Sequence, residues 1–518
     1  MYYDNLRSAE ATNRYVMKGA GTEVFEPHFT FQGFRYVMVS GYPGVLKQDA
    51  IRGMVIHSDM GQAGTFSCSD SLINQLQHNI VWGLKGNFLD VPTDCPQRDE
   101  RLGWTGDAQV FAPTACFNMH AATFYKKWLR DMAADQTSEG MIHNVIPDVL
   151  GGGGATGWAD AGVVIPWVVY MNYADTSVLE DQFDSMKKWI GYMEEHAGED
   201  LVWDGDFHFG DWLSFDDSSP AYMGAYTLTD LLATAYFAYS SGIVSDVAAI
   251  LGRNDEAAHY KELSEQVKHA FRDEFVTPNG RLVSHTQTAY TLALAFDLLD
   301  ERTEQLAARH LGNNVQQFGH ITTGFLGTPL ISLTLTGYGM NELAYLLLNR
   351  KEYPSWLYPV TMGATTIWER WDGQKPDSTF QDPGMNSFNH YAYGAIGNWL
   401  YQVVAGIGID PDQPGYKHVI IHPRPGGGLT WAKASHESMY GTISSGWKKD
   451  GDQLTMEAEI PANTTASLHI TGQPEQIFIN GTGLIQSGLS YRTTEEGVVA
   501  ETGSGRYKIT TTLKEPRE

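Results

Sequence analysis

A long run of helical segments fills the chain between residues 69 and 406 and largely decides its fold class. The segments are rich in Ala, Leu and aromatic residues, and loops join them, several of which are long and aromatic. We expect helices over residues 70–85, 106–120, 122–137, 159–173, 177–196, 223–240, 256–275, 286–299, 301–313, 340–349 and 387–404. So many consecutive helices favour a closed double ring over a short bundle.

The two ends of the chain have a β character. Residues 29–39 are aromatic and β-branched, with Gly33 suggesting a bulge, so we expect strands within residues 23–57. This stretch is too short for an independent β-domain. After residues 411–415 (PDQPG) the helical signal stops, and residues 453–460 alternate between apolar and polar side chains. A C-terminal antiparallel sandwich is therefore expected.

Composition excludes several classes of function. The chain has 35 Lys and Arg against 61 Asp and Glu, a formal net charge of −26, which disfavours nucleic acid and anionic membranes as partners. Its 3 cysteines, Cys68, Cys95 and Cys116, suit neither a disulfide framework nor a zinc cluster. No apolar stretch approaches the ~20 residues of a membrane span. The start of the chain lacks the apolar core of a signal peptide, so we expect a cytoplasmic chain. The first methionine is not necessarily the native start.

One turn-rich segment, residues 94–107 (DCPQRDERLGWTGD), concentrates chemistry. It contains Asp94, Asp99, Glu100 and Asp107 together with two arginines and a tryptophan. Carboxylates at close range raise one another's pKa values, and an enzyme that protonates a leaving oxygen needs such a carboxyl group. A solvated acidic loop is the alternative interpretation, but the prolines, glycines and Trp104 indicate a constrained turn.

A second segment, residues 362–373 (MGATTIWERWDG), places Glu369 between two tryptophans. A buried ion pair between Glu369 and Arg370 would be a purely structural explanation. Two acid-and-aromatic segments in one chain nevertheless favour glycoside hydrolysis, which requires two carboxyl groups facing each other across a sugar.

Both segments, with residues 145–149 (VIPDV), 157–161 (GWADA) and 388–394 (FNHYAYG), resemble the bacterial α-L-rhamnosidases of glycoside hydrolase family 78. The similarity runs from about residue 20 to near the C-terminus, with the motifs in the expected order. It implies a mainly α fold: an (α/α)6 barrel catalytic domain over residues 64–410, the trailing part of a β-sandwich over residues 1–63, and a C-terminal β-sandwich over residues 411–518.

The resemblance also implies an activity and a site. It indicates an inverting, exo-acting hydrolase that releases terminal L-rhamnose from α-L-rhamnosides of glycans or natural-product glycosides, with Glu100 as general acid and Glu369 as general base. Asp94, Arg98 and Asp107 match positions that bind the rhamnose hydroxyls, and His390 becomes a candidate sugar contact. The methyl group of the deoxy sugar calls for aromatic faces; the remaining candidates of the binding site are Trp104, Trp158, Asp211, Trp212 and Trp371.

Three rival hypotheses remain open at this stage. The acidic residues of the first segment could hold Ca²⁺ or Mg²⁺, although no EF-hand spacing supports this, and we expect no metal. Another inverting glycosidase with a different glycone could use the same barrel. A non-catalytic carbohydrate-binding protein could keep the tryptophans, but it would not need both Glu100 and Glu369. No nucleotide or dinucleotide fingerprint is present, and we expect no cofactor. The sequence does not address the oligomeric state.

Overall fold

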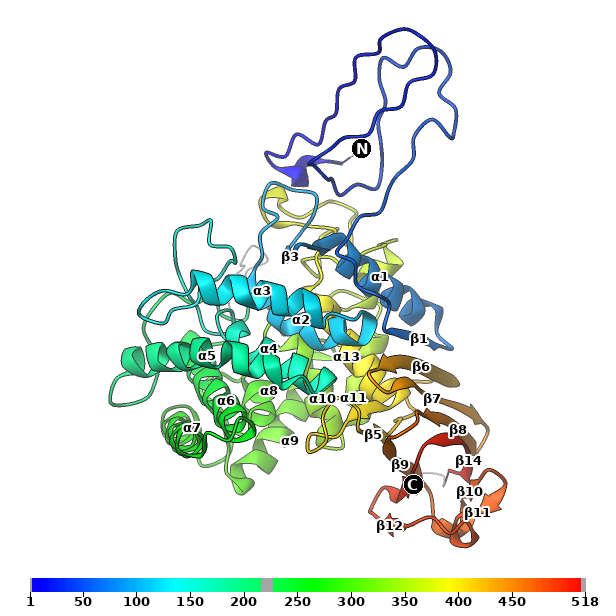
Figure 1. Cartoon of the computed structure of the whole chain (residues 1–518). Coiled ribbons are helices and arrows are strands. Elements are labelled where there is room, and N and C mark those ends of the chain that lie inside the picture. The colour runs from blue at the N-terminus through cyan, green and yellow to red at the C-terminus, as the bar shows by residue number, and fades with distance from the viewer. Residues whose placement is uncertain (1, 216–226, 514–518) are drawn as a thin grey trace.

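The computed structural model describes residues 2–215 and 227–513, and it shows a helical domain between an extended N-terminal segment and two C-terminal sheets (Figure 1). The fold class predicted from the sequence is confirmed. The predicted start of one helix, at Met223, lies outside the described residues.

The structure has 13 α-helices among the described residues, and most of the longer ones begin and end within a few residues of a predicted range. They are α1 (Ser71–Asn87), α2 (Thr105–Asn118), α3 (Ala122–Asp135), α4 (Ala161–Tyr173), α5 (Thr176–Ala197), α6 (Thr229–Ile250), α7 (Asn254–Phe275), α8 (Gln287–Ala295), α9 (Glu301–Phe318), α10 (Thr328–Gly337), α11 (Asn341–Asn349), α12 (Leu357–Thr361) and α13 (Gly397–Trp399).

An inner ring of helices forms the centre of the domain. Contacts run from α2 to α4, α6, α8 and α10, then to the 3-10 turn η3 (Ala392–Ile396), and from η3 back to α2, which closes the ring. In α2 and α8 nearly every residue is buried, and their sequences are apolar or small on all sides. Helices of this composition are stable only when surrounded by protein.

The helices between them in sequence form an outer layer. Helices α3, α5, α7 and α9 each bury one face and expose a charged one, as amphipathic surface helices do. Because inner and outer helices alternate along the chain, the inner helices begin at one end of the ring. The loops that precede them therefore gather at that end.

Three parts of the helical domain differ from the sequence expectation, one of them the short helix α12, which was not predicted. Helix α10 was not predicted, because its sequence (TPLISLTLTG) is rich in the Thr and Ile residues that favour strands. The predicted helix over residues 387–404 is correct only from Ala392 onward, where η3, α13 and the π-helical turn η4 (Leu400–Ala405) follow one another.

The N-terminal segment contradicts the prediction of strands within residues 23–57. Apart from the 3-10 turn η1 (Asp4–Leu6), described residues up to 61 form no helix or strand, and most are exposed. A strand requires hydrogen bonds to a neighbouring strand, and no described part of the chain supplies one. Figure 1 shows this segment, in dark blue, as a long excursion that extends away from the helices.

Two sheets form the C-terminal part. The first has the order β1-β6-β7-β8-β14-β10-β11 and the second β12-β13-β9-β5-β4. Their strands are β1 (Gly64–Cys68), β4 (Ile407–Ile409), β5 (His418–Ile421), β6 (Trp431–Ser438), β7 (Gly441–Asp450), β8 (Gln453–Ile460), β9 (Thr465–Thr471), β10 (Phe478–Ile479), β11 (Thr482–Gly483), β12 (Tyr491–Thr493), β13 (Gly497–Thr502) and β14 (Gly505–Thr512). A short hairpin, β2 (Phe88–Leu89) with β3 (Val91–Pro92), lies apart from both sheets.

Strand β8 buries every second residue, which confirms the predicted alternation over residues 453–460. The sequence did not predict that β1, which precedes the first helix, pairs antiparallel with β6 at the edge of the C-terminal sheet. This pairing ties the start of the helical domain to the far end of the chain. No helix among the described residues is long and apolar enough to cross a membrane.

Candidate active site

The two segments singled out in the sequence meet at the end of the ring where the inner helices begin. The first, residues 94–107, spans most of the loop from β3 to α2 and the start of α2, and the second, residues 362–373, opens the loop from α12 to η3. The Gln97 side-chain amide donates to Oγ of Ser387 at 2.6 Å, which joins the two loops directly. Both loops precede inner elements, so the closure of the ring brings them together.

Arg98 lies at the centre of the site and is 1% exposed. Its guanidinium donates to both oxygens of Glu369, at 2.9 and 3.2 Å. The Nη2 atom also contacts Oδ2 of Asp94 at 3.2 Å and Oε2 of Glu100 at 2.7 Å. Burial opposes the charge of Arg98, but Glu369 and the other two carboxylates raise its pKa, so it stays cationic. One buried cation thus holds three of the predicted site residues.

Glu369 is 3% exposed and lies in a loop fixed by backbone hydrogen bonds. Its amide donates to the Ser387 carbonyl at 2.9 Å. Burial alone would raise the pKa of Glu369, but Arg98, followed by His390, lowers it below the usual value. The carboxyl group is therefore ionised at neutral pH, as a base or a nucleophile requires.

Glu100 differs from Glu369 in being partly open to solvent, with 19% of its side chain exposed. Its Oε1 atom accepts a hydrogen bond from the Trp104 indole N–H at 2.9 Å. Its Oε2 atom contacts Arg98 and, at 3.3 Å, Nη1 of Arg7 from the N-terminal segment. The carboxyl group is thus fixed at both oxygens while it remains accessible.

Asp94 is the third carboxylate at Arg98. Its Oδ1 atom accepts from the Leu102 amide at 2.9 Å, and the Cys95 thiol lies 2.8 Å from Oδ2. Burial, with the nearby charge of Glu100, raises the pKa of Asp94 to about 7, despite the opposing effect of Arg98. Burial also raises the pKa of the Cys95 thiol, which agrees with a structural role for that cysteine.

A buried ion pair joins the starts of two inner elements. Asp107, in the first turn of α2, lies 2.9 Å from Nε2 of His390, which stands just before η3. Burial lowers the pKa of His390, but Asp107 and then Glu369 outweigh it and raise the pKa above the usual value. The structure therefore brings His390 close to Glu369, with Asp107 on the other side of the imidazole.

An aromatic group adjoins Glu100, and its centre is Phe209, a residue that is not among the candidates predicted from the sequence. Phe209 contacts Trp104 edge-on at 5.6 Å between ring centroids, Trp158 at 4.7 Å and Trp212 at 5.9 Å. Gly106 allows Trp158 to cover the start of α2, because an added Cβ there would lie 2.6 Å from the indole. Nothing in the sequence joins Phe209 to Trp104, which lies in another loop.

Two further predicted contacts have roles that the structure explains without a ligand. Asp211 is fully buried and accepts hydrogen bonds from the Gly324 amide at 2.6 Å, the Leu326 amide at 2.8 Å and the Thr288 hydroxyl. This carboxylate fixes the turn before α10, so its predicted sugar contact stays a prediction. Trp371 stacks on Tyr393 at 3.9 Å and is 5% exposed.

A metal would have to compete with Arg98 at this site. Among the described residues, Asp94, Cys95 and Glu100 offer possible ligand atoms within 4.8 Å of one another. The Arg98 guanidinium already contacts both of these carboxylates. A divalent ion there would place two cations side by side, so this donor set does not fit a metal.

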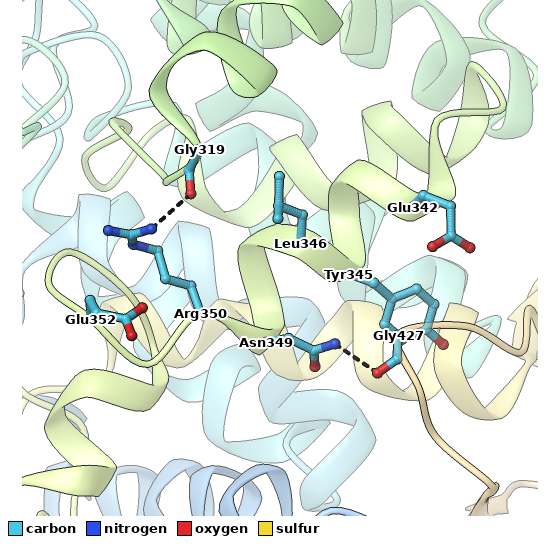
Figure 2. A pocket seen from close by; sticks show the side chains of 8 residues that line it. All are labelled: Gly319, Glu342, Tyr345, Leu346, Asn349, Arg350, Glu352 and Gly427. Atoms are coloured by element: carbon cyan, nitrogen blue, oxygen red, sulfur yellow. Dashed lines mark hydrogen bonds between the residues drawn. The ribbon is translucent and has the colours of Figure 1, made fainter.

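A separate pocket lies along α11 and contains none of these groups (Figure 2). Glu342, Leu346 and Asn349 line it, and the Arg350 side chain at its edge donates to the Gly319 carbonyl at 3.2 Å. Asn349 donates to the Gly427 carbonyl at 2.8 Å, which places the pocket where the helices meet the C-terminal sheets. We assign the chemistry to the carboxylate cluster instead.

A closed double ring of helices, with paired acid-and-aromatic loops at one end, defines the six-hairpin glycosidase fold. Three family models agree: the bacterial α-L-rhamnosidase six-hairpin glycosidase domain matches residues 61–404, the α-L-rhamnosidase C-terminal domain residues 408–483, and the α-L-rhamnosidase concanavalin-like domain residues 1–57. The chain belongs to the bacterial α-L-rhamnosidase family.

Individual relatives support this assignment. An α-L-rhamnosidase of Streptomyces avermitilis is 42% identical over 513 residues, which cover 98% of this chain and 48% of the relative. An α-L-rhamnosidase of Formosa agariphila is 42% identical over 496 residues, 93% of this chain and 53% of the relative. The crystal structure of the Streptomyces avermitilis α-L-rhamnosidase complexed with L-rhamnose superposes with a TM-score of 0.92 at 41% identity, covering 99% of this chain and 48% of that one. The chain thus spans about half the length of these relatives.

Proposed function

We propose that the chain is an inverting, exo-acting α-L-rhamnosidase that removes terminal L-rhamnose from α-L-rhamnosides. The observation that carries this proposal is the pair Glu100 and Glu369, two carboxylates on separate loops that share one buried arginine. Glycoside hydrolysis requires two such groups, and a non-catalytic sugar-binding protein does not. The similarity to a structure complexed with L-rhamnose supports the choice of glycone.

The different environments of the two glutamates support their different roles. Glu369 is buried and ionised, and it would remove a proton from the attacking water. Glu100, with 19% of its side chain exposed, would protonate the glycosidic oxygen and then regain a proton from solvent. The water oxygen bonds to the anomeric carbon as the bond from that carbon to the glycosidic oxygen breaks. One proton passes from the water to Glu369, and one passes from Glu100 to the leaving oxygen.

The other buried polar groups would bind the sugar. Arg98 and His390 lie beside Glu369, and Asp94 and Asp107 contact these two cations. Such charged groups form the stronger hydrogen bonds to hydroxyl groups. Trp104 and its aromatic neighbours would cover the apolar C5 methyl group. A buried base is reached more readily by a chain end than by the middle of a polysaccharide, which favours exo action.

The stereochemical course depends on the separation of the two carboxyl groups, which lie in a tight cluster around Arg98. The Nη2 atom of Arg98 lies 2.7 Å from Oε2 of Glu100 and 3.2 Å from Oε1 of Glu369. The distance between these two oxygens therefore cannot exceed the sum of the two distances. The carboxyl groups as a whole lie farther apart than their nearest oxygens. Inverting pairs are separated by roughly 6.5–9.5 Å and retaining pairs by about 5–5.5 Å.

The deciding experiment is hydrolysis of an aryl α-L-rhamnopyranoside by the purified chain, followed by proton NMR before mutarotation. Initial release of β-L-rhamnose is expected and supports Glu369 as a base. Initial release of α-L-rhamnose would make Glu369 a nucleophile and overturn inversion. If the folded chain releases no rhamnose, while a matched aryl glucoside or galactoside is cleaved, the proposed glycone is wrong.

A further inference from the structure

Residues 2–8 reach the proposed general acid. Tyr2 stacks on Phe380 with ring centroids 3.9 Å apart, and Asn5, in the turn η1, is buried. Arg7 donates through Nη1 to the Gly384 carbonyl at 3.3 Å. This short stretch is therefore packed against the loop between α12 and η3, whereas the residues that follow it extend away from the helices (Figure 1).

Arg7 bridges two neighbouring acids of the first site segment. Its Nε and Nη2 atoms each lie 2.6 Å from Oδ1 of Asp99, and the Ser8 hydroxyl also donates to Asp99. Its Nη1 atom lies 3.3 Å from Oε2 of Glu100. Asp99 thus anchors the guanidinium, and the remaining nitrogen is directed at Glu100. A fork of donors on two carboxylates is a contact that arginine makes and lysine does not reproduce.

Glu100 needs such support, because no helix or strand holds it. Residues 93–103 form an irregular loop, and Glu100 is partly exposed. Its other side-chain contacts, Arg98 and Trp104, come from the same loop. Sites built on loops are held less firmly than sites on helices and strands unless surrounding side chains fix them. Among residues 2–215 and 227–513, Arg7 is the contact that ties Glu100 to a distant part of the chain.

We propose that Arg7 is a positioning residue that holds Glu100 in the orientation for proton donation, so that the N-terminal segment completes the acid side of the site. This inference rests on the proposed function. It predicts a specific signature, since a general acid matters most when the leaving group is a poor one. An alkoxide leaving group needs its proton during bond cleavage, whereas a dinitrophenolate leaves without one.

The test compares two substrates across four proteins: the wild-type chain, Arg7→Gln, Arg7→Lys and Arg14→Gln. Arg14 is exposed in the same segment and has no ion pair among the described residues. Arg14→Gln is therefore the control, because it removes one positive charge from this segment as Arg7→Gln does, without removing a contact to Glu100. The substrates are methyl and 2,4-dinitrophenyl α-L-rhamnopyranoside. Thermal unfolding of each variant reports whether it folds.

We expect Arg7→Gln to lower kcat by about tenfold or more on the methyl glycoside and by less than about threefold on the dinitrophenyl glycoside, with KM changed little. In Arg7→Lys the loss of kcat should again be larger on the methyl glycoside than on the dinitrophenyl glycoside, but by a smaller factor. If Arg7→Gln does not fold, the comparison of Arg7→Lys with the wild type decides the question. Arg14→Gln should match the wild type. Equal losses on both substrates, or none, would overturn the inference while the proposed function stands. A wild-type chain that cleaves neither substrate would overturn both.

Discussion

Replacement of Arg98 by methionine tests the electrostatic account of the site without reference to catalysis. The substitution keeps a long apolar stem but removes the cation that contacts Asp94, Glu100 and Glu369. Removing one partner of a buried ion pair typically costs 3–5 kcal/mol, because the other charge stays buried without compensation. Here three carboxylates lose their common partner, so we expect the upper part of that range at high pH.

The sign of the pH dependence follows from Glu369. In the wild type its pKa is lowered, since Arg98 and His390 outweigh burial, so the ion pair stabilises the fold above the unfolded pKa and this stabilisation is lost as pH falls. Without Arg98, burial dominates and raises the pKa of Glu369 above the unfolded value. The variant fold is then favoured when the acid is protonated, and it loses stability as pH rises through the raised pKa.

The assay is thermal unfolding of Arg98→Met and the wild type at pH 5 and pH 8. A loss of about 4–5 kcal/mol, divided by the unfolding entropy of a chain of 518 residues, corresponds to a fall in Tm of roughly 4–5 °C at pH 8, and we expect less than about 2 °C at pH 5. Arg130→Met is the control, because Arg130 forms an exposed pair with Asp181 and should change Tm little at either pH. A fall in Tm that is equal at both pH values, or larger at pH 5, would refute this reasoning.

Three further predictions concern individual side chains. Glu100→Gln and Glu369→Gln should each lower kcat by about 10²–10⁴-fold in a folded protein, and near-normal turnover in either variant, judged against exposed Glu274→Gln, would remove that residue from the mechanism. Trp104→Phe removes the indole donor to Glu100 and should raise KM by about three- to tenfold with some loss of kcat; an unchanged KM would exclude a sugar contact. Asp211→Asn should cost about 2–3 kcal/mol of stability, seen as faster proteolysis, whereas exposed Asp204→Asn should behave as wild type, and equal resistance of the two would contradict the structural role of Asp211.

Much of the site could be predicted because its residues lie in short contiguous strings. Asp94, Arg98, Glu100 and Trp104 share one turn-rich segment, and their chemistry is visible without a fold. Their distances to Glu369 were not predictable, because 271 residues separate Arg98 from its hydrogen-bond partner. The hub position of Phe209 was missed for the same reason, since contacts between loops depend on how the ring closes.

By itself the sequence determined the local structure and the residue types of the chemistry. Helical composition over residues 69–406 and alternation over residues 453–460 are local properties, and the structure confirms both. The tertiary structure alone decided which carboxylate is buried and ionised, that β1 joins the C-terminal sheet, and that Arg7 reaches Glu100. A pKa or a strand pairing depends on neighbours in space, and those neighbours come from distant parts of the chain. The same reason explains why residues 29–39 have strand-forming side chains but no strand: the described chain offers them no neighbouring strand.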